Sequence, residues 1–334
     1  MSTLGPTGAH KILQVHPTRR CNLRCLHCYS SSGPDEGERL DLELLRGAVA
    51  DAAREGYTVL SVSGGEPLLY RPLGALLEHA RAHGLATTVT TNGTLLGARQ
   101  LELLRGRVDL LAISLDGAPA SHDRMRGAAG AFERLRRHLG GVRAAGIAFG
   151  FIFTLTQRNL GELAWVAEFA AAEGASLLQV HPLEGVGRAQ AQLRPELPDA
   201  LEASYAYLEV ARLRAAVGDT LRLHIDLAYR GGLLEHPERV FVGEALGHPE
   251  GRGLAAYVSP LVVEPDGTVV PLRYGFSRAH ALGNLHNRPL VDLAEAWRQT
   301  RLGQFGELCR RALEGLKGPA APPFVNLYDV LANA

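Results

Sequence analysis

Short apolar runs alternate along this chain with longer segments in which apolar residues return every three or four positions. In one such segment, Leu42, Leu45, Val49 and Ala52 would share one face of a helix. The apolar runs predict six strands, at Ile12–His16, Val59–Ser63, Ala86–Thr91, Leu110–Leu115, Ala148–Thr154 and Ser176–Val180. The periodic segments predict five helices between them, at Leu40–Glu55, Pro72–His83, Gly97–Arg105, Ala131–Ala145 and Leu160–Glu173.

This alternation of strands and helices predicts an α/β fold with a parallel sheet and right-handed crossovers. Gly56, Gly84, Gly146 and Gly174 each follow an expected helix closely, as residues that end helices do. Six units suit either a doubly wound sheet or part of a β/α barrel, and both folds bind ligands at the carboxyl ends of their strands. The unusual polar motifs of this chain fall at those ends, so we expect them to share one site.

The amino-acid composition of the chain changes near Gly185. Residues 185–198 are rich in Arg, Gln, Gly and Pro, which predicts a connecting loop. Further on, the pattern predicts helices at Asp199–Ala216, Leu290–Thr300 and Leu302–Leu313. It predicts a hairpin with an Asp-Gly turn, formed by Val262–Glu264 and Thr268–Pro271, and a surface tail at Gly318–Pro323. We expect three parts: an N-terminal segment 1–10, a core 11–220 and a smaller α+β extension 221–334.

Composition narrows the classes of partner and compartment. The chain has 334 residues, 46% hydrophobic and 21% charged, which is enough for a substantial core. Lys plus Arg equals Asp plus Glu at 35 each, so bulk charge gives no reason to expect nucleic acid or an acidic membrane as partner. The N-terminus has no apolar run of signal-peptide length, and four cysteines are too few for a disulfide framework. These features predict a cytoplasmic protein.

Three of the four cysteines lie within eight residues, at Cys21, Cys25 and Cys28, directly after the first expected strand. The spacing C-x3-C-x2-C lets the thiols converge only if the backbone loops around a common centre. Arg19 and Arg20 precede the first cysteine, and nearby arginines favour thiolate over thiol. The cluster of thiols therefore predicts a ligand site in the loop after the first strand.

Three interpretations of these thiols stay open from the spacing alone. They could be buried and unused, although this spacing is rarely an accident. A structural zinc site would need a fourth ligand, for which His16 and His27 are the nearby candidates. An iron–sulfur cluster explains more, because thiolates hold such clusters and three protein ligands leave one iron open for chemistry.

A second motif, Gly64-Gly65-Glu66-Pro67, follows the second expected strand. Two glycines let backbone approach a ligand without interference from a Cβ atom, or adopt positive φ. Glu66 supplies an acceptor that could receive an ammonium group, and Pro67 ends the turn. On its own the motif is equally typical of an ordinary turn.

Together, C-x3-C-x2-C after a first strand and Gly-Gly-Glu-Pro after a second resemble the radical S-adenosylmethionine (radical SAM) superfamily. The resemblance covers roughly Lys11–Glu184 and the remainder more weakly. It implies a partial (β/α)6 TIM-like barrel in which Cys21, Cys25 and Cys28 hold one [4Fe–4S] cluster. The methionine end of SAM would occupy the fourth iron, and one electron would cleave SAM to a 5′-deoxyadenosyl radical that abstracts a substrate hydrogen.

The resemblance also implies contacts with SAM. Gly64, Gly65, Glu66 and Pro67 would hold its methionine end. Asn92, in the Thr-Asn-Gly sequence after the third strand, would line the site. Ser114 and Asp116, after the fourth strand, would bond ribose hydroxyls, or else mark a turn. Arg126 would steer the carboxylate of SAM, or else lie in solvent. Thr154 and His181 would border the adenine, or simply line the barrel.

The C-terminal third contains the stretches Pro260–Pro271, Leu282–Leu285 and Ala294–Trp297. Together they resemble the SPASM/twitch extension of many radical SAM enzymes, but in a degenerate form. Such extensions bind auxiliary clusters through several cysteines. Leu272 stands where one would be expected, and only Cys309 is present. One thiol cannot hold a cluster, so we expect none in this region. Polar candidates for the substrate end are found here, either in a solvated loop or in ion pairs that hold a lid: His224, Asp226, Tyr229, Arg273 and Tyr274.

The sequence thus predicts a radical SAM enzyme with one [4Fe–4S] cluster and SAM, acting on a ribosomal peptide or a natural-product intermediate. A tetrapyrrole or another small molecule is the alternative substrate class. Two further alternatives are a SAM-binding iron–sulfur carrier without turnover and a zinc-stabilised binding protein. A reductant such as flavodoxin or ferredoxin is implied. Because Met1–Lys11 is too short for a peptide-recognition domain, a peptide substrate would need a separate recognition protein or direct contact.

Overall fold

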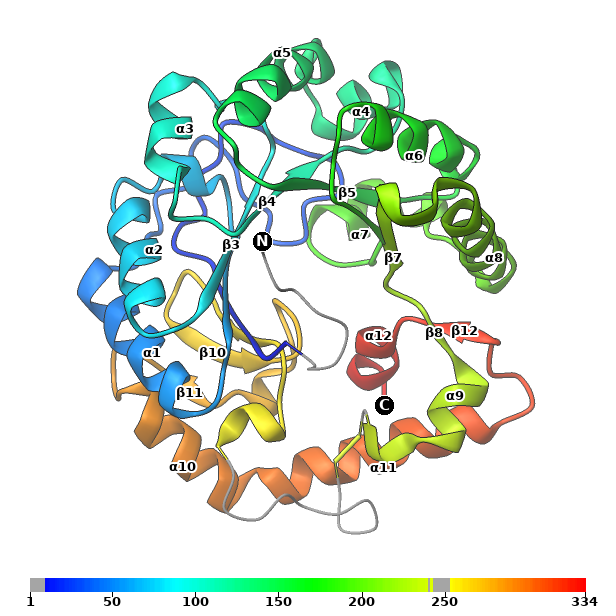
Figure 1. The fold of residues 1–334 in the computed structure, drawn as a ribbon. Helices are drawn as coiled ribbons and strands as arrows, with labels where there is room; N and C mark the ends of the chain where they lie inside the picture. The colour runs from blue at the N-terminus through cyan, green and yellow to red at the C-terminus, as the bar shows by residue number, and fades with distance from the viewer. Residues whose placement is uncertain (1–9, 240, 243–252) are drawn as a thin grey trace.

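The computed structural model describes residues 10–239, 241–242 and 253–334, and its centre is one curved sheet of ten strands (Figure 1). The strand order is β11-β10-β9-β1-β2-β3-β4-β5-β6-β7. The strands are β1 Ile12–Val15, β2 Val59–Val62, β3 Ala86–Thr91, β4 Leu110–Ser114, β5 Phe149–Leu155, β6 Leu177–Pro182, β7 Arg222–Ile225, β9 Leu261–Val263, β10 Thr268–Pro271 and β11 Gly283–Asn284. From β9 through β1 to β7, every neighbouring pair is parallel.

Helices form an outer layer around the convex side of this sheet (Figure 1). They are α1 Leu42–Arg54, α2 Leu73–Ala82, α3 Ala98–Leu104, α4 Pro119–Arg126, α5 Ala131–Ala144, α6 Leu163–Ala172 and α8 Ala200–Val217, whereas the short helix α7 Arg188–Gln192 lies outside this layer. The α1 helix illustrates how the sequence produces them. Asp41 caps its first turn by accepting a hydrogen bond from the Glu43 N–H, and Leu45, Val49 and Ala52 bury its inner face.

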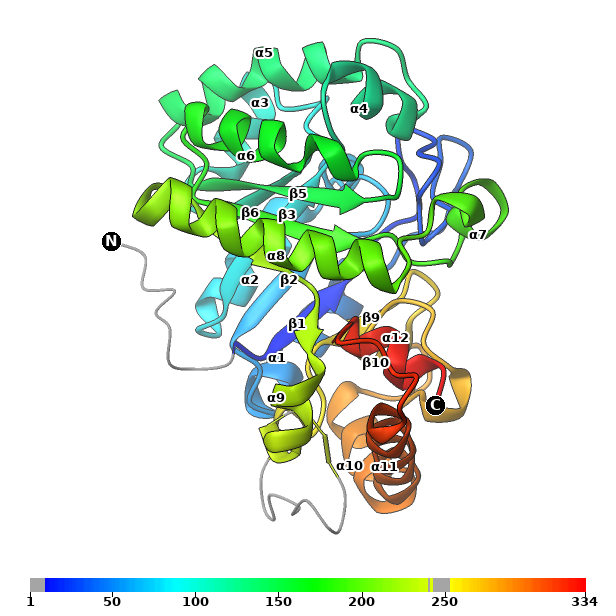
Figure 2. The same ribbon diagram turned by 90° about the vertical axis from the view of Figure 1, so that its right-hand side faces the viewer.

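The predicted α/β fold with a partial TIM-like barrel is therefore confirmed. The six predicted strands and five predicted helices occur within one or two residues of their expected ends, except that Leu160–Glu162 is a 3-10 turn before α6. Gly56, Gly84, Gly146 and Gly174 all have positive φ, which explains why glycine ends these helices. The carboxyl ends of the strands meet at one end of the sheet, where α7 also lies (Figure 2).

Some elements were not predicted. Residues 185–198 were expected to be a loop, but they contain the short helix α7, and α4 was not foreseen. The strand β7 also lacked a prediction, because its residues alternate charged and apolar over only four positions. Since β7 pairs with β6, the sheet runs past residue 220 without interruption. The division of the chain at that residue stays a prediction.

The C-terminal region adds to the sheet and covers its open side (Figure 1). Its predicted hairpin is β9–β10, whose first strand pairs with β1. The other elements are β8 Ala228–Tyr229, α9 Arg230–Glu235, α10 Leu290–Thr300, α11 Leu302–Lys317, β12 Phe324–Val325 and α12 Leu327–Ala332. The strands β8 and β12 form a separate antiparallel pair, and β12 directly follows the expected surface tail. Across the part of the chain that is described, no helix is both long and apolar enough to cross a membrane.

Candidate functional site

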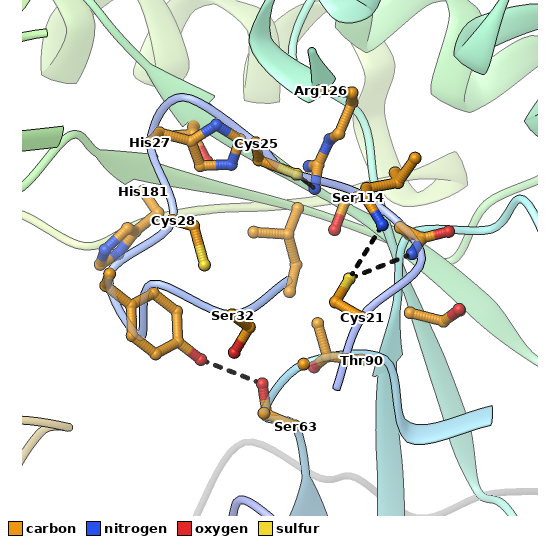
Figure 3. A pocket seen from close by; sticks show the side chains of 18 of the residues that line it. Cys21, Cys25, His27, Cys28, Ser32, Ser63, Thr90, Ser114, Arg126 and His181 are labelled. Atoms are coloured by element: carbon orange, nitrogen blue, oxygen red, sulfur yellow. Dashed lines mark hydrogen bonds between the residues drawn. The ribbon is translucent and has the colours of Figure 1, made fainter. Parts of the chain in front are cut away.

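All three clustered cysteines line one cavity at the carboxyl ends of the strands (Figure 3). Their loop joins β1 to α1 and is fixed by backbone hydrogen bonds from Cys21 to Gly33 at 3.0 Å and from Leu26 to Met125 at 2.9 Å. Cys21 and Cys25 are buried, whereas Cys28 is half-buried. We call this space of about 270 Å³ the first cavity. The sequence prediction that the thiols converge is consistent with this geometry.

Strand ends supply the rest of the first cavity. Of the residues expected at the SAM site, five line it: Gly64, Gly65, Asn92, Ser114 and Arg126. Thr154 and His181, the expected neighbours of adenine, also line it. Glu66, Pro67 and Asp116 do not line it, and their surroundings explain why.

The first cavity suits a cluster of several irons in its chemistry. Burial raises the pKa of the Cys21 thiol to about 12, so an isolated thiolate there would be costly and a cationic partner would offset that cost. Within the described residues, no three His, Cys, Asp or Glu side chains are close enough to hold a single metal ion. Sulfurs on one zinc ion would lie about 4 Å apart. The side chains as placed therefore form no zinc site, while three thiols around one cavity fit a larger group.

Arg19, one of the two arginines expected to favour thiolate, is engaged by carboxylates. Arg19 forms ion pairs with Glu36 and Glu38, both at 3.2 Å. The cation that does reach a thiol is Arg126, whose Nη1 lies 3.7 Å from the Cys25 sulfur. The alternative that Arg126 lies in solvent is wrong, because its exposed fraction is 6%.

Asp116 lies behind Arg126 rather than in the first cavity. Its carboxylate is fully buried and forms an ion pair with the Arg126 guanidinium at 2.6 Å. Burial alone would raise the pKa of Asp116, but Arg126, His27 and His122 more than offset that effect and hold the pKa below its usual range. In this position Asp116 orients Arg126 toward Cys25. Its predicted bond to a ribose hydroxyl is not favoured by the geometry, whereas Ser114 does face the cavity.

We predict that Asp116→Asn will lower the free energy of unfolding of the apo-protein by about 3 kcal/mol, because it leaves the Arg126 guanidinium buried without a counter-charge. Urea denaturation at pH 7, under anaerobic reducing conditions, measures the change. Glu43→Gln is the matched control, because its ion pair with Arg46 is exposed and its loss should cost less than about 0.5 kcal/mol. Equal effects of the two variants would contradict the role of Asp116.

The Gly-Gly-Glu-Pro loop is packed against the segment that precedes the cysteines. A Cβ atom on Gly65 would lie 2.2 Å from the Arg20 carbonyl oxygen, and one on Gly64 would lie 2.8 Å from that of Thr18. Gly64 also has a φ of 112°, which glycine alone adopts readily. The two glycines thus allow two loops to touch directly at the wall of the first cavity.

Glu66 is fully buried and is occupied by groups of the protein itself. Its carboxylate accepts hydrogen bonds from the Thr91 hydroxyl at 2.8 Å, the Asn92 N–H at 3.0 Å and the Leu68 N–H at 3.2 Å. Burial raises the pKa of Glu66, and these hydrogen bonds offset only part of the rise. Pro67 opens the 3-10 turn Pro67–Leu69. Glu66 therefore joins the ends of β2 and β3, and its contact with an ammonium group stays a prediction.

Asn92 connects the third strand end to the cysteine loop. Its side-chain Nδ2 donates to Oδ1 of the Asn22 side chain at 2.9 Å and lies 3.9 Å from the Cys21 sulfur. Its side-chain Oδ1 accepts from the Thr94 N–H at 3.0 Å. The Thr-Asn-Gly motif thus orients a thiol as well as lining the cavity.

A second cavity, of about 300 Å³, adjoins the first. Both are bordered by the same residues along their common wall, which are Gln14, Tyr29, Thr90, Ile152, Gln179, His181 and Glu184. Asp226, Arg273 and Tyr274, which were expected at the substrate end, line the second cavity. Tyr229 does not, because it is 57% exposed on β8 and packs near Phe324.

Ion pairs tie the C-terminal region to this cavity, as one of the two alternatives predicted. The Arg273 guanidinium lies 2.8 Å from Glu184 and 2.8 Å from Asp329 of α12. Leu272, at the position where an auxiliary-cluster cysteine was expected, has a φ of 68° and is buried at the edge of the same cavity. Glu184 and Tyr328 also line the second cavity, and no local pattern singled them out because the fold alone brings them there.

A dyad of His181 and Asp226 stands in the wall of the second cavity. His181 Nδ1 lies 2.8 Å from an Asp226 oxygen, and His224 Nδ1 lies 3.2 Å from the other oxygen. These hydrogen bonds overcome the effect of burial and hold the pKa of Asp226 well below its usual range. Burial alone would lower the pKa of His181, but the bond to Asp226 and the nearby carboxylates raise it.

Cys309 takes no part in either cavity. It is buried in α11 beside Leu308, Phe305 and Ala312, as a core residue. Neither cavity has it among its lining residues. Its position is that of a residue packed in the protein core.

Comparison with known proteins adds an independent line of information. The family model of the radical SAM superfamily matches residues 15–170. The chain is 30% identical over 288 residues to the Fe-coproporphyrin III synthase of Methanosarcina barkeri, covering 83% of this chain and 71% of that protein. It is 33% identical over 223 residues to the mycofactocin maturase MftC of Mycobacterium ulcerans, covering 65% of this chain and 59% of that protein.

A solved structure shows the same fold. Streptococcus suis SuiB, bound to the precursor peptide SuiA, superposes with a TM-score of 0.68 over 88% of this chain and 66% of that one. At 16% identity this likeness concerns the fold alone. It matches the arrangement of strands and outer helices seen here.

Proposed function

This chain belongs to the radical SAM superfamily of enzymes, which use a [4Fe–4S] cluster and SAM, and on that premise we propose that it reductively cleaves SAM and abstracts a hydrogen atom from a peptide or natural-product intermediate. One observation carries the proposal. The thiols of Cys21, Cys25 and Cys28 line a single cavity together with the ends of β2 to β6. That cavity opens beside a second one with polar walls, where a substrate would lie.

The residues of the first cavity divide the binding tasks. The three cysteines would hold the cluster, and Asn92 and Arg126 would orient Cys21 and Cys25 through their hydrogen bonds. Gly64 and Gly65 provide backbone without side chains at the wall, and Ser114 offers a hydroxyl. Bound there, the cluster and SAM supply hydrogen-atom abstraction from an unactivated C–H bond. The burial of this wall would keep water from the reacting atoms.

The charge of the second cavity favours a peptide over a carboxylate-rich tetrapyrrole. Its lining includes two carboxylates, Glu184 and Asp226, and the Arg273 guanidinium is already paired with Glu184 and Asp329. His181 is paired with Asp226, so among the described lining residues a substrate with several carboxylates would meet no cation without a carboxylate partner. The names of MftC, a maturase, and of SuiB bound to its precursor peptide give further support.

A tetrapyrrole remains the second candidate, because the Fe-coproporphyrin III synthase matches more of this chain than MftC does. We also propose a cytoplasmic setting, a flavodoxin- or ferredoxin-like reductant, and a separate recognition protein if the substrate is a ribosomal peptide. These partners follow from the proposed chemistry, which needs an electron from outside the chain.

The substrate class is tested by stimulation of SAM cleavage. The reconstituted enzyme is incubated with SAM, dithionite and either a short peptide encoded beside its gene or a porphyrin from a panel of iron tetrapyrroles, because an enzyme like the Fe-coproporphyrin III synthase would make that compound rather than consume it. We expect the peptide to raise the rate of 5′-deoxyadenosine formation and to change in mass. A mass change of the porphyrin, with no effect of the peptide, would overturn the peptide assignment and leave SAM cleavage itself intact.

We further propose that His181 transfers protons to or from the substrate, with Asp226 fixing the Nδ1–H tautomer. The Nε2 atom is then left for the substrate, since among the described side chains only the Glu184 carboxylate approaches it, at 3.8 Å. Both cavities are bordered by His181, so one imidazole faces the expected SAM site and the substrate site together.

We predict that Asp226→Asn will lower the pKa of His181, because the substitution removes the carboxylate charge that stabilises the imidazolium. In the wild type, His181 would therefore stay protonated to a higher pH than in the variant. NMR titration of labelled histidines measures both values, with His181→Gln used for assignment. Asp266→Asn, on the exposed hairpin turn, should leave the titration of His181 unchanged; an equal shift in that control would contradict the pairing.

A further inference from the structure

The cysteine loop is held from outside by a short segment that follows β6. This segment contains Gly187 and Arg188, at the start of α7, and was expected to be a connecting loop. It lies about 160 residues further along the chain than the thiols, yet the backbone N–H of Arg188 donates to the Cys28 carbonyl oxygen at 3.0 Å. The two segments thus meet directly at a cysteine of the motif.

The Arg188 side chain bridges two more carbonyl groups of the same loop. Its Nε donates to the Cys25 carbonyl oxygen at 2.8 Å, and its Nη2 donates to that of Ser32 at 2.6 Å. With the backbone bond to Cys28, one residue satisfies three acceptors that span the loop. Hydrogen bonds from a charged donor are stronger than neutral ones, and the forked guanidinium suits two acceptors at once.

Gly187 allows this contact sterically. A Cβ atom at this position would lie 2.3 Å from the Tyr29 carbonyl oxygen and 2.5 Å from that of Cys28. Its φ of 58° with ψ of −135° is also a conformation that side chains disfavour. The glycine therefore lets the backbone of this segment lie flat against the cysteine loop.

Apolar contacts with other elements of the fold also anchor the segment. Ala189 and Leu193 are buried with Met125 and Leu183 in a small apolar cluster, against which Leu26 of the cysteine loop also packs. Because the anchor lies in the body of the protein, the hydrogen bonds of Arg188 can transmit that rigidity to the loop.

We propose that Gly187 and Arg188 form a brace that holds the three-cysteine loop in its cluster-binding conformation before the cluster arrives, with Arg188 as the positioning residue. The proposal rests on the assignment of Cys21, Cys25 and Cys28 as cluster ligands. Preorganisation of the loop lowers the ordering cost that cluster binding would otherwise meet. Arg188 also lines the first cavity, so its positive charge favours the reduced, more negative state of the cluster.

Two variants separate the geometry of Arg188 from its charge. Arg188→Lys keeps the charge but places its donors on a single atom, whereas Arg188→Gln removes the charge. In the full-length apo-protein under anaerobic reducing conditions, hydrogen exchange is measured at the Cys21, Leu26, Ser31 and Gly33 amides, all of which are hydrogen-bonded. We expect about tenfold faster exchange in both variants, since charge-assisted hydrogen bonds to the loop are lost.

Reconstitution with ferrous iron and sulfide provides the second readout. We expect both variants to lose cluster absorbance faster than the wild type in the presence of a chelator. The midpoint potential, followed by electron paramagnetic resonance, should fall in Arg188→Gln and stay near the wild-type value in Arg188→Lys. Gly187→Ala, which keeps the guanidinium, should reproduce the faster exchange by pushing the segment away.

The controls decide between a brace and a general loss of stability. Arg194 lies in the turn after α7 and makes none of the hydrogen bonds to the cysteine loop described above. Arg194→Gln should therefore leave the exchange rates of the loop amides and the midpoint potential of the cluster unchanged. Wild-type exchange rates in the Arg188 and Gly187 variants would overturn the brace. An equal acceleration of hydrogen exchange at amides throughout the sheet would also overturn it, because it would indicate a general loss of stability. The apo-protein measurements do not depend on SAM cleavage, so failure of the brace and failure of the proposed function are distinguishable.

Discussion

Cys25→Ala will leave the protein unable to form 5′-deoxyadenosine above the background without enzyme. Cys25 is buried, and Arg126 lies 3.7 Å from its sulfur. Its removal leaves two thiols for a cluster that needs three, and also leaves the Arg126 guanidinium without that acceptor. Iron and sulfide content after anaerobic reconstitution, together with mass-spectrometric quantification of 5′-deoxyadenosine, measures the effect.

Cys309→Ala is the matched control for this prediction. The same chemical change is made at a buried cysteine of α11 that borders neither cavity. It should retain the full iron content and the rate of SAM cleavage, with at most the modest loss of stability that follows from a smaller core side chain. Activity retained by Cys25→Ala and lost by Cys309→Ala would show that the site has been placed in the wrong loop.

Gly65→Ala will weaken SAM binding about a hundredfold, which corresponds to about 3 kcal/mol. The added Cβ would lie 2.2 Å from the Arg20 carbonyl oxygen and 2.6 Å from its carbonyl carbon, and these are backbone atoms that cannot rotate away. The loop after β2 must then move relative to the cysteine loop at the wall of the first cavity. Equilibrium dialysis with labelled SAM, on iron-replete protein, measures the loss of affinity.

Gly47→Ala is the control of opposite expected sign. A Cβ on Gly47 meets no atom within 4 Å, and the residue lies inside α1. Alanine should therefore raise the free energy of unfolding by about 0.5–1 kcal/mol and leave SAM affinity unchanged. Unchanged SAM affinity in Gly65→Ala would mean that the close approach of the two loops does not shape the binding site.

The repeating elements of the fold were predictable because their pattern is local. Helices such as α1 show an apolar residue every three or four positions, and the buried parallel strands are short apolar runs. The strand β7 was missed because its sequence, Arg-Leu-His-Ile, is too short and too polar to stand out. It is held in the sheet by pairing with β6, which the sequence does not encode locally.

The sequence allowed most residues of the candidate site to be predicted, but it did not allow the orientation of their side chains to be predicted. The cysteines, Gly64, Gly65, Asn92 and Ser114 line the cavity as expected. Glu66 and Asp116 are in the same region but face inward, since their carboxylates are taken by backbone N–H groups or by Arg126. Whether a carboxylate faces a ligand or its own protein depends on neighbours from other strands.

Contacts between distant segments could not be predicted from the sequence. In the sequence, Arg188 is one of several arginines in a polar segment and nothing distinguishes it. Its three hydrogen bonds to the cysteine loop form only because the fold places the start of α7 beside that loop. Likewise, Arg273 was one of several polar candidates, and its ion pairs with Glu184 and Asp329 join three separate parts of the chain. Such pairs require the fold before they can be recognised.

The central claim is that this chain cleaves SAM at a cluster held by its three clustered cysteines. The most direct measurement is the amount of 5′-deoxyadenosine formed by wild-type protein reconstituted anaerobically with iron and sulfide and supplied with SAM and dithionite. The account predicts product that requires SAM, dithionite and all three cysteines. Protein that is iron-replete yet forms no 5′-deoxyadenosine, with or without the peptide, or protein that takes up zinc in place of iron, would contradict it.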